Sequence, residues 1–287
     1  MPEGHTLHRL ARELHTGLAG TTPAVSSPQR RFVEAEALSG ELLLRAYAVG
    51  KHLLLQFEST TVHVHLGLFG RVFRNKSPAP APRETIRLRL VGLTRTWDIC
   101  GPTCCACIDE AALAALVSRI GADPLSAHNE RQVVTELWQK LKRTRRPIGA
   151  LLLDQRLMSG IGNVYRAEIL FMLKMNPLMP GKSLSRIQVQ SIWRLAVTLL
   201  AKGAKAGRIV TTAQLPGMRK TKRESLHVYR KRECSQCASA ILALDLAGRP
   251  LYACPQCQSI DASTAALAQP RPNRSTRSAE ALAMQHY

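Results

Sequence analysis

The chain opens with Met1-Pro2-Glu3-Gly4-His5 and runs on into a helical pattern. Leucine and alanine recur at helical spacing from position 7 to position 18, so the sequence predicts one amphipathic helix over residues 3–18. On its own this is an ordinary helix start, because proline and glutamate are both favoured in a first turn. If Met1 is removed, however, Pro2 becomes a free secondary amine with the carboxyl of Glu3 beside it. The partial positive charge of a helix N-terminus disfavours a protonated amine, so Pro2 would be nucleophilic near neutral pH.

The composition is strongly basic. Lysine and arginine number 40 against 20 aspartates and glutamates, which gives a formal net charge of +20 and a pI near 10.3 over 287 residues. Such an excess indicates a polyanionic partner, nucleic acid first and anionic membrane second. No run approaches the roughly 18 apolar residues of a spanning helix, and the first residues do not resemble a signal peptide. We therefore expect a soluble intracellular protein with no membrane partner. We further expect it to be a monomer and to be cytoplasmic and nucleoid-associated.

Residues 41–99 alternate short β-like runs with turn signals, which predicts an antiparallel sandwich or barrel with the first helix packed on it. The runs are 41–48, 52–57, 61–66, 71–74, 84–91 and 94–99. Lys51 follows a glycine between two runs, which puts a cation at a hairpin tip, although a lone lysine is usually only a solvated surface residue. Leu68 and Phe69 lie between two glycines. Residue statistics favour their burial in the core, and the alternative is an outward wedge that fills the gap left by a flipped nucleotide.

The second half of the chain is helical by pattern, and residues 121–125 mark the boundary. The predicted helices cover 108–120, 133–141, 148–155, 164–173 and 183–203. The turn Ser159-Gly160-Ile161-Gly162-Asn163 lies between two of them. Asn163 is a favourable N-cap and the helix start behind it is an anion site, so the turn is either a phosphate clamp or an ordinary helix hairpin. Five cations within residues 140–146 form a solvated face or a phosphate-facing strip, and residues 204–225 suggest a mobile basic loop.

The cysteines form two groups with different spacing. Two Cys-x2-Cys pairs separated by 16 residues predict a four-thiolate zinc site made of Cys234, Cys237, Cys254 and Cys257. The insert predicts a hairpin that carries Arg249 at its tip, where a guanidinium can grip a nucleic-acid backbone. The other group is Cys100, Cys104, Cys105 and Cys107. Its spacing does not match a structural zinc site, so we expect reduced thiols in a loop.

Taken together, these stretches resemble the formamidopyrimidine-DNA glycosylase and endonuclease VIII family of base-excision repair enzymes. The resemblance is closest to the endonuclease VIII branch and covers nearly the whole chain apart from the tail. The motifs that carry it are residues 1–5, 49–53, 65–70, 120–125, 153–155 with 159–168, and 248–258. The resemblance implies an α+β fold in which an N-terminal helix lies on an antiparallel β-sandwich and a helical domain carries a helix–two-turn–helix and a zinc-finger hairpin. The expected parts are a catalytic domain over 1–120, a helical domain over 121–225, a zinc finger over 226–261 and a disordered tail over 262–287.

The resemblance also implies a bifunctional DNA glycosylase and AP lyase with one structural Zn²⁺ and damaged DNA as its partner. Pro2 would attack C1′ of a flipped damaged nucleotide to form a Schiff base, and β,δ-elimination would then cut the strand on both sides of the sugar. Glu3 would move the protons that these steps need, and Lys51 would assist them. The residues that the resemblance assigns to DNA contacts are Lys51, Leu68, Phe69, Asn163 and Arg249.

One departure from the family pattern bears on the substrate. Members of the formamidopyrimidine type carry an Asp-Pro-Arg-Arg-Phe-Gly loop where this chain has Asp98-Ile99-Cys100-Gly101-Pro102. Without an arginine to pair with the opposite base, we expect oxidised pyrimidines in duplex, single-stranded or looped DNA. The alternatives are an oxidised-purine glycosylase and a non-catalytic zinc-finger DNA-binding protein of the same fold. A ribosomal RNA-binding protein would explain the charge but not the N-terminal proline or the apolar turn.

Overall fold

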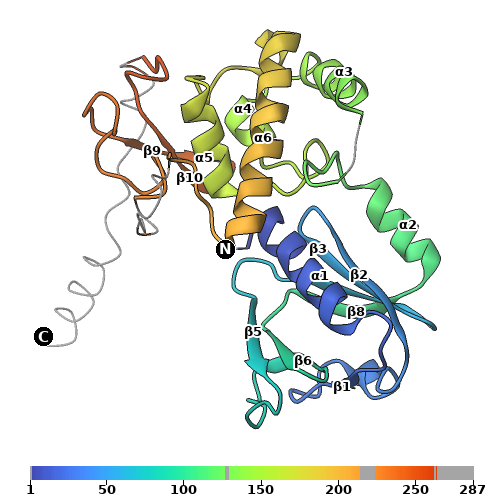
Figure 1. Ribbon diagram of the computed structural model, residues 1–287. Coiled ribbons are helices and arrows are strands. Elements are labelled where there is room, and N and C mark those ends of the chain that lie inside the picture. Colours follow the sequence, from blue (N-terminus) through green and yellow to red (C-terminus); the bar gives the residue numbers. More distant parts are fainter. Residues whose placement is uncertain (1, 127–128, 214–220, 222–223, 262, 264–287) are drawn as a thin grey trace, which may run out of the picture.

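The structure is a computed structural model that describes every residue except 1, 127–128, 214–220, 222–223, 262 and 264–287 (Figure 1). Two antiparallel four-stranded sheets and helix α1 form one half, a group of helices forms the other, and a two-stranded hairpin lies beside the helices (Figure 1). This is the α+β architecture expected from the resemblance. Among the described residues, the helices include none with the length and apolar character needed to cross a membrane.

The two sheets carry all the strands predicted between residues 41 and 99. One sheet has the order β2 (Leu43–Val49), β3 (His52–Phe57), β4 (Thr61–His65) and β8 (Cys104–Ile108). The other has the order β1 (Ala24–Ser26), β6 (Ile86–Val91), β7 (Arg95–Cys100) and β5 (Arg71–Lys76). The short 3₁₀ turn η1 (Val33–Ala35) follows β1.

Strand β8 corrects the expectation that the first cysteine group lies in a loop. Its register pairs Cys104 with His65 and Cys107 with Val62, so these thiols belong to an edge strand. Cys105 and Cys107 pack against the core of the sandwich. Side chains two positions apart in a strand point to the same face, so Cys105 and Cys107 both face the core. Each thiol packs there as a small apolar residue. The short strand β1 was likewise not predicted.

Helix α1 (Gly4–Leu18) links the two halves. Its buried face, which includes Leu10, Leu14 and Leu18, packs on strands β2 and β3, and the helix also contacts α6 (Arg186–Ala206). The start of α1 lies where the sandwich meets the helical half (Figure 1). The N-terminal residues are therefore placed at a junction and not on a free surface.

The helical half contains α2 (Glu110–Ser118), α3 (Glu130–Leu141), α4 (Ile148–Leu151), α5 (Asn163–Met172), η2 (Gly181–Ser183) and α6. Helix α4 ends four residues before the predicted end, because the side chain of Asp154 accepts the backbone N–H of Arg156 and turns the chain. Helix α6 begins at a capping box formed by Ser185 and Gln188 and ends at Gly207, whose φ of 69° is left-handed. The expected loop over 204–225 thus begins as helix, and residues 214–220 and 222–223 of it lie outside the described residues.

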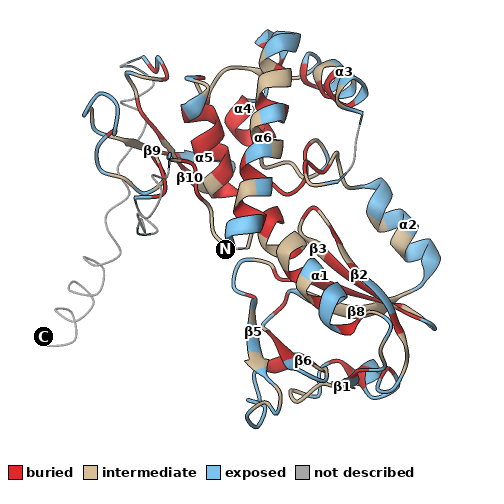
Figure 2. Ribbon diagram, in the orientation of Figure 1, coloured by how far each residue is buried: buried red, intermediate tan, exposed pale blue. Residues whose placement is uncertain are grey.

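The C-terminal hairpin pairs β9 (Leu242–Leu246) with β10 (Arg249–Ala253). The turn residues Ala247 and Gly248 both have positive φ, as a two-residue hairpin turn requires. Leu244 and Leu251 share a buried cluster with Phe171 of α5, and α5 is buried along most of its length (Figure 2). Nearly all of the predicted tail lies outside the described residues, and the predicted boundaries at 120, 225 and 261 stay predictions.

Candidate active site

The carboxylate of Glu3 is fully buried and receives three backbone N–H groups from the start of helix α5. Gly162 and Val164 donate at 2.8 and 2.9 Å, and Tyr165 donates at 3.4 Å. Glu3 is itself the N-cap of α1 but makes no side-chain bond into that helix. The electrostatic support for this carboxylate therefore comes from α5, more than 150 residues away in the sequence, and not from its own helix.

This arrangement corrects the expected role of the 159–163 turn. Gly162, and not Asn163, is the N-cap of α5, and Asn163 is the first helical residue without a side-chain capping bond. The anion at this helix start is Glu3 of the same chain, so the turn does not offer these N–H groups to a phosphate. The sequence pattern identified an anion site correctly but not the anion that fills it.

Glycines allow this close approach. A Cβ atom on Gly162 would lie 2.4 Å from the carboxyl carbon of Glu3, and one on Gly4 would lie 2.7 Å from the Cα of Gly160. The N–H of Gly4 donates to the carbonyl of Gly160 at 2.8 Å. The N-terminus and the turn are thus in direct backbone contact.

Lys51 reaches the same turn from the hairpin between β2 and β3. Its Nζ donates to the carbonyl oxygen of Ile161. Burial lowers the pKa of Lys51 to about 8, and the nearby carboxylate of Glu3 opposes that shift. Burial raises the pKa of Glu3, while Lys51 and the three N–H groups act in the opposite direction. The site therefore holds an acid that tends toward its neutral form beside an amine that loses its proton more readily than ordinary lysines do.

Sequence reasoning gave no role to two residues that hold this geometry. Asp123 accepts hydrogen bonds from Nε2 of His8 at 2.7 Å and from the N–H of Gly50 at 2.6 Å, so it fixes the hairpin tip against α1. Gln155 accepts the N–H of Gly160 and donates to the carbonyl of Ile161, both at 3.0 Å. Both residues lie inside motifs that carried the family resemblance, which is the signal that could have identified them.

A cleft of about 550 Å³ opens in front of these groups. Pro2, Lys51, Leu68 and Arg249 lie on its wall. The other lining residues are Leu7, His65, Leu66, Gly67, Thr103, Arg146, Ala150, Leu153, Asp154, Gln155, Arg156 and Ala247. Glu3 is not among them, since it lies beneath the surface next to Pro2.

Leu68 and Phe69 are not core residues. Leu68 is 47% exposed and Phe69 is 86% exposed, so the expectation of burial drawn from residue statistics is wrong for both. The turn leaves β4 at His65 and is held by Thr103, which donates to the backbone carbonyl of His65 at 3.0 Å. Exposed apolar side chains beside a cleft are characteristic of binding surfaces.

Asn163 is only 3% exposed, and its amide connects α5 to the C-terminal hairpin. It donates to the carbonyl of Pro250 at 2.8 Å and accepts a hydrogen bond from Arg166. Arg166 is fully buried and also donates to the carbonyls of Leu246 and Arg249, on either side of the hairpin turn. These bonds fix where the hairpin tip meets the cleft. A direct DNA contact by Asn163 stays a prediction.

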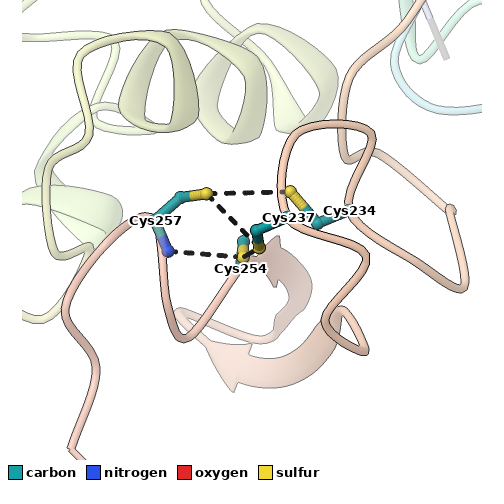
Figure 3. A group of neighbouring side chains, drawn as sticks. All are labelled: Cys234, Cys237, Cys254 and Cys257. Carbon is teal, nitrogen blue, oxygen red and sulfur yellow. Dashed lines mark hydrogen bonds between the residues drawn. The ribbon is translucent and has the colours of Figure 1, made fainter.

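Cys234, Cys237, Cys254 and Cys257 point toward one another (Figure 3). All four Sγ atoms lie within 4.8 Å of one another, with closest pairs at 3.4, 3.6 and 3.8 Å. A tetrahedral metal with metal–sulfur bonds of about 2.3 Å requires sulfur atoms about 3.8 Å apart. The donor set therefore fits a metal ion, as the spacing predicted. Across the described part of the chain, no other cysteine, histidine or carboxylate group converges in this way.

Comparisons with known proteins agree with this architecture. The model for the formamidopyrimidine-DNA glycosylase N-terminal domain matches residues 1–98, and the model for the H2TH domain of the same enzymes matches residues 120–214. Endonuclease 8 1 of Mycobacterium tuberculosis is 39% identical over 276 residues, which cover 90% of this chain and all of the relative. The formamidopyrimidine-DNA glycosylase of Thermus thermophilus is 30% identical over 280 residues, which cover 90% and 97%.

Solved structures show the same fold. The formamidopyrimidine-DNA glycosylase of Lactococcus lactis, non-covalently bound to DNA with an AP site, superposes with a TM-score of 0.73 at 22% identity, over 89% of this chain and 99% of that chain. The fold and the site thus define a DNA repair glycosylase. The chain belongs to the formamidopyrimidine-DNA glycosylase and endonuclease VIII family.

The contact between Gly162 and Glu3 yields a direct test. Replacing Gly162 with alanine places a methyl group on the Glu3 carboxyl and should displace it from the α5 N–H groups. We expect DNA strand incision to fall by about a hundredfold or more, the usual scale for a misplaced acid/base group. Gly20→Ala is the control, because an added methyl there meets open space; Gly20 has a φ of 76°, whereas Gly162 has a φ of −121°, so the control adds backbone strain without the contact to Glu3. Equal incision rates in the two variants would show that the contact is dispensable.

Proposed function

We propose that this protein is a bifunctional DNA glycosylase and AP lyase that removes oxidised bases through a Schiff base on Pro2. The observation that carries the proposal is the buried Glu3 carboxylate, held by α5 directly beside Pro2, with Lys51 on the other side of the same turn. The cleft in front of these groups is lined by cations, which suits a polyanion.

The reaction follows from the positions of these groups. After removal of Met1, the nitrogen of Pro2 attacks C1′ of the damaged nucleotide, the glycosidic bond breaks and the base leaves with a proton. The sugar ring opens to an iminium, and loss of a C2′ proton expels the 3′ phosphate oxygen. A second elimination expels the 5′ phosphate, and water releases the sugar fragment from Pro2. Glu3 can donate and accept protons in these steps, and its burial raises its pKa above that of an ordinary glutamate.

The DNA contacts divide by type. Lys51 and Arg249 on the cleft wall hold the phosphate backbone around the lesion, and the family resemblance implies Asn163 as a further contact, while exposed Leu68 and Phe69 occupy the space that the flipped nucleotide leaves. Bending the duplex and extruding a nucleotide cost several kcal/mol, and the cost is lowest at a damaged, poorly stacked base. Phosphate contacts offset that cost and make binding steeply dependent on salt.

Oxidised pyrimidines are the proposed substrates. Asp98 is buried and paired with Arg89 at 2.6 Å, and only a short turn over residues 101–103 joins β7 to β8. No arginine lies in that turn to contact a base opposite the lesion. The greater identity to the mycobacterial endonuclease 8 than to the Thermus formamidopyrimidine-DNA glycosylase supports the same assignment.

Borohydride trapping tests the mechanism. With DNA that carries an abasic site, the reductant should convert the Schiff base to a stable adduct, and peptide mapping should place it on Pro2. Glu3→Gln should reduce glycosylase turnover by at least about a hundredfold while DNA is still bound. A purified protein that binds this DNA but gives no adduct, or that retains Met1, would instead be the non-catalytic zinc-finger protein. Duplexes and single strands with one oxidised pyrimidine or one 8-oxoguanine, compared by incision rate, then test the substrate class.

The metal is proposed to be one structural zinc ion per chain. Cys237→Ser should abolish zinc binding and loosen the hairpin, which then keeps only the buried cluster around Leu244 and Phe171 and the hydrogen bonds from Asn163 and Arg166. DNA affinity should fall as Arg249 loses its position. Elemental analysis and fluorescence anisotropy measure both effects. Cys104→Ser is the matched control and should keep one zinc; a full zinc complement in Cys237→Ser, or a different metal in the native protein, contradicts the assignment.

Lys51 should give DNA binding a pH dependence. Its pKa of about 8 means that it is mostly charged at pH 7 and mostly neutral at pH 9, whereas ordinary lysines remain charged across this range. A phosphate contact made by this ammonium group is therefore lost as pH rises through about 8. We expect affinity for an abasic-site duplex to fall over that interval in the native protein and to stay level in Lys51→Arg. Parallel pH profiles for the two proteins would rule out a charged contact by Lys51.

A further inference from the structure

Two arginines on the cleft wall share one carboxylate. Asp154 accepts Nη1 of Arg146 at 3.2 Å, and it accepts Nε and Nη2 of Arg156 at 3.1 and 3.2 Å. All three residues line the same cleft as Pro2 and Lys51. Arg146 precedes α4 and Arg156 lies between α4 and α5, so the carboxylate joins two separate segments of the chain.

The carboxylate is sheltered and the two guanidinium groups are open. The side chain of Asp154 is 12% exposed, against 53% for Arg146 and 77% for Arg156. Hydrogen bonds from Arg156 hold the pKa of Asp154 at about 2, so it remains ionised. A guanidinium has five N–H donors, and these bonds use two on Arg156 and one on Arg146. The remaining donors can serve a ligand.

Stability alone does not account for this arrangement. Both arginines of these ion pairs are more than half exposed, so water screens the pairs, and ordering two long side chains costs entropy. A carboxylate that receives two cations also leaves one positive charge uncompensated. If no anionic ligand bound there, the excess positive charge would repel neighbouring cations without stabilising the protein.

The neighbouring charges identify the ligand class. The cleft lining contains Lys51, Arg146, Arg156 and Arg249 as cations and Asp154 as the carboxylate. Guanidinium groups match the geometry of phosphate oxygens and bind them in a bidentate manner. A carboxylate that fixes the arginine rotamers before binding reduces the entropy lost when a phosphate arrives.

We propose that Arg146, Asp154 and Arg156 form a backbone-phosphate clamp, in which Asp154 orients the two arginines toward successive phosphates of the bound strand. This inference deepens the proposed function and rests on it. Of the five cations in residues 140–146, Arg146 lies on the cleft wall, whereas Lys142 stacks on Trp138 at 4.8 Å from the ring centre. Arg146 is therefore the one of these five cations that the proposal places in the cleft.

The salt dependence of DNA binding tests the clamp. Fluorescence anisotropy with a short duplex that carries a tetrahydrofuran abasic-site analogue gives the slope of log affinity against log salt between about 50 and 200 mM. Each lost phosphate contact reduces that slope by about 0.9. We expect this reduction in Arg146→Gln and in Arg156→Gln, and about twice as much in the double variant. All three substituted proteins should keep the fold, since both side chains are largely exposed.

Arg194→Gln is the matched control. Arg194 is a 63% exposed arginine that pairs with Glu130 at 2.8 Å and is absent from the cleft lining, so its loss removes the same charge elsewhere. Its slope should equal that of the native protein. If the double variant shows the same slope as Arg194→Gln, the clamp does not exist.

Asp154→Asn separates orientation from charge. The variant adds one net positive charge to the cleft, and it leaves one uncharged acceptor oxygen in place of the two carboxylate oxygens that hold the guanidinium groups. If Asp154 orients them, affinity for the abasic-site duplex falls by about threefold to tenfold although the charge rises; a gain in affinity would show that Asp154 only neutralises charge and would overturn its proposed role. Borohydride trapping with the native protein is a separate test. If the salt slopes rule out the clamp, trapping can still demonstrate the proposed Schiff-base chemistry. If trapping gives no adduct, the salt slopes still report the number of phosphate contacts.

Discussion

The structure depends on one buried contact, in which the carboxylate of Glu3 occupies the N-terminus of helix α5. An ionisable group with no exposed surface is costly unless its charge is compensated, and three backbone N–H groups and Lys51 provide that compensation. The donors belong to the helical half and the acceptor to the N-terminus of α1. The two halves of the protein therefore cannot separate without exposing an unsatisfied helix start. The residue that we propose as the acid/base group therefore also joins the two halves.

Helix α5 organises the rest of the cleft in the same way. Its first turn holds Glu3, its buried Arg166 holds the carbonyls on both sides of the hairpin turn, and its Glu168 accepts the N–H groups of residues 227–229. A single rigid element thus sets the positions of the N-terminus and the metal-binding hairpin. Hydrogen bonds to a shared helix explain how residues from the two ends of the chain can meet with fixed geometry.

Sequence patterns predicted the features that depend on local spacing. The four-thiolate cluster, the strands between residues 41 and 99 and the amphipathic first helix all follow from periodicity or ligand spacing. Contacts across more than 70 residues have no local signal, so the partner of Glu3 and the bonds of Asp123 could not be derived. The cysteine-rich β8 lacks the usual β-branched pattern, and it is a strand because its edge position pairs it with β4. Residue statistics misplaced Leu68 and Phe69 because averages over all proteins describe cores and not binding surfaces.

The cleft combines two electrostatic environments that suit the two tasks of the proposed function, proton transfer and DNA binding. Beneath its surface, burial moves the pKa of Glu3 up and that of Lys51 down, so both approach the range in which protons are exchanged near neutral pH. On its wall, hydrogen bonds from Arg156 hold the pKa of Asp154 at about 2, so this carboxylate remains ionised and pairs with two arginines. Proton transfer needs groups that can lose or gain charge, whereas holding a polyanion needs groups that cannot. Under the proposed function, these requirements are separated by depth, with Glu3 and Lys51 inside and the permanently charged arginines on the cleft wall, so that neither task compromises the other.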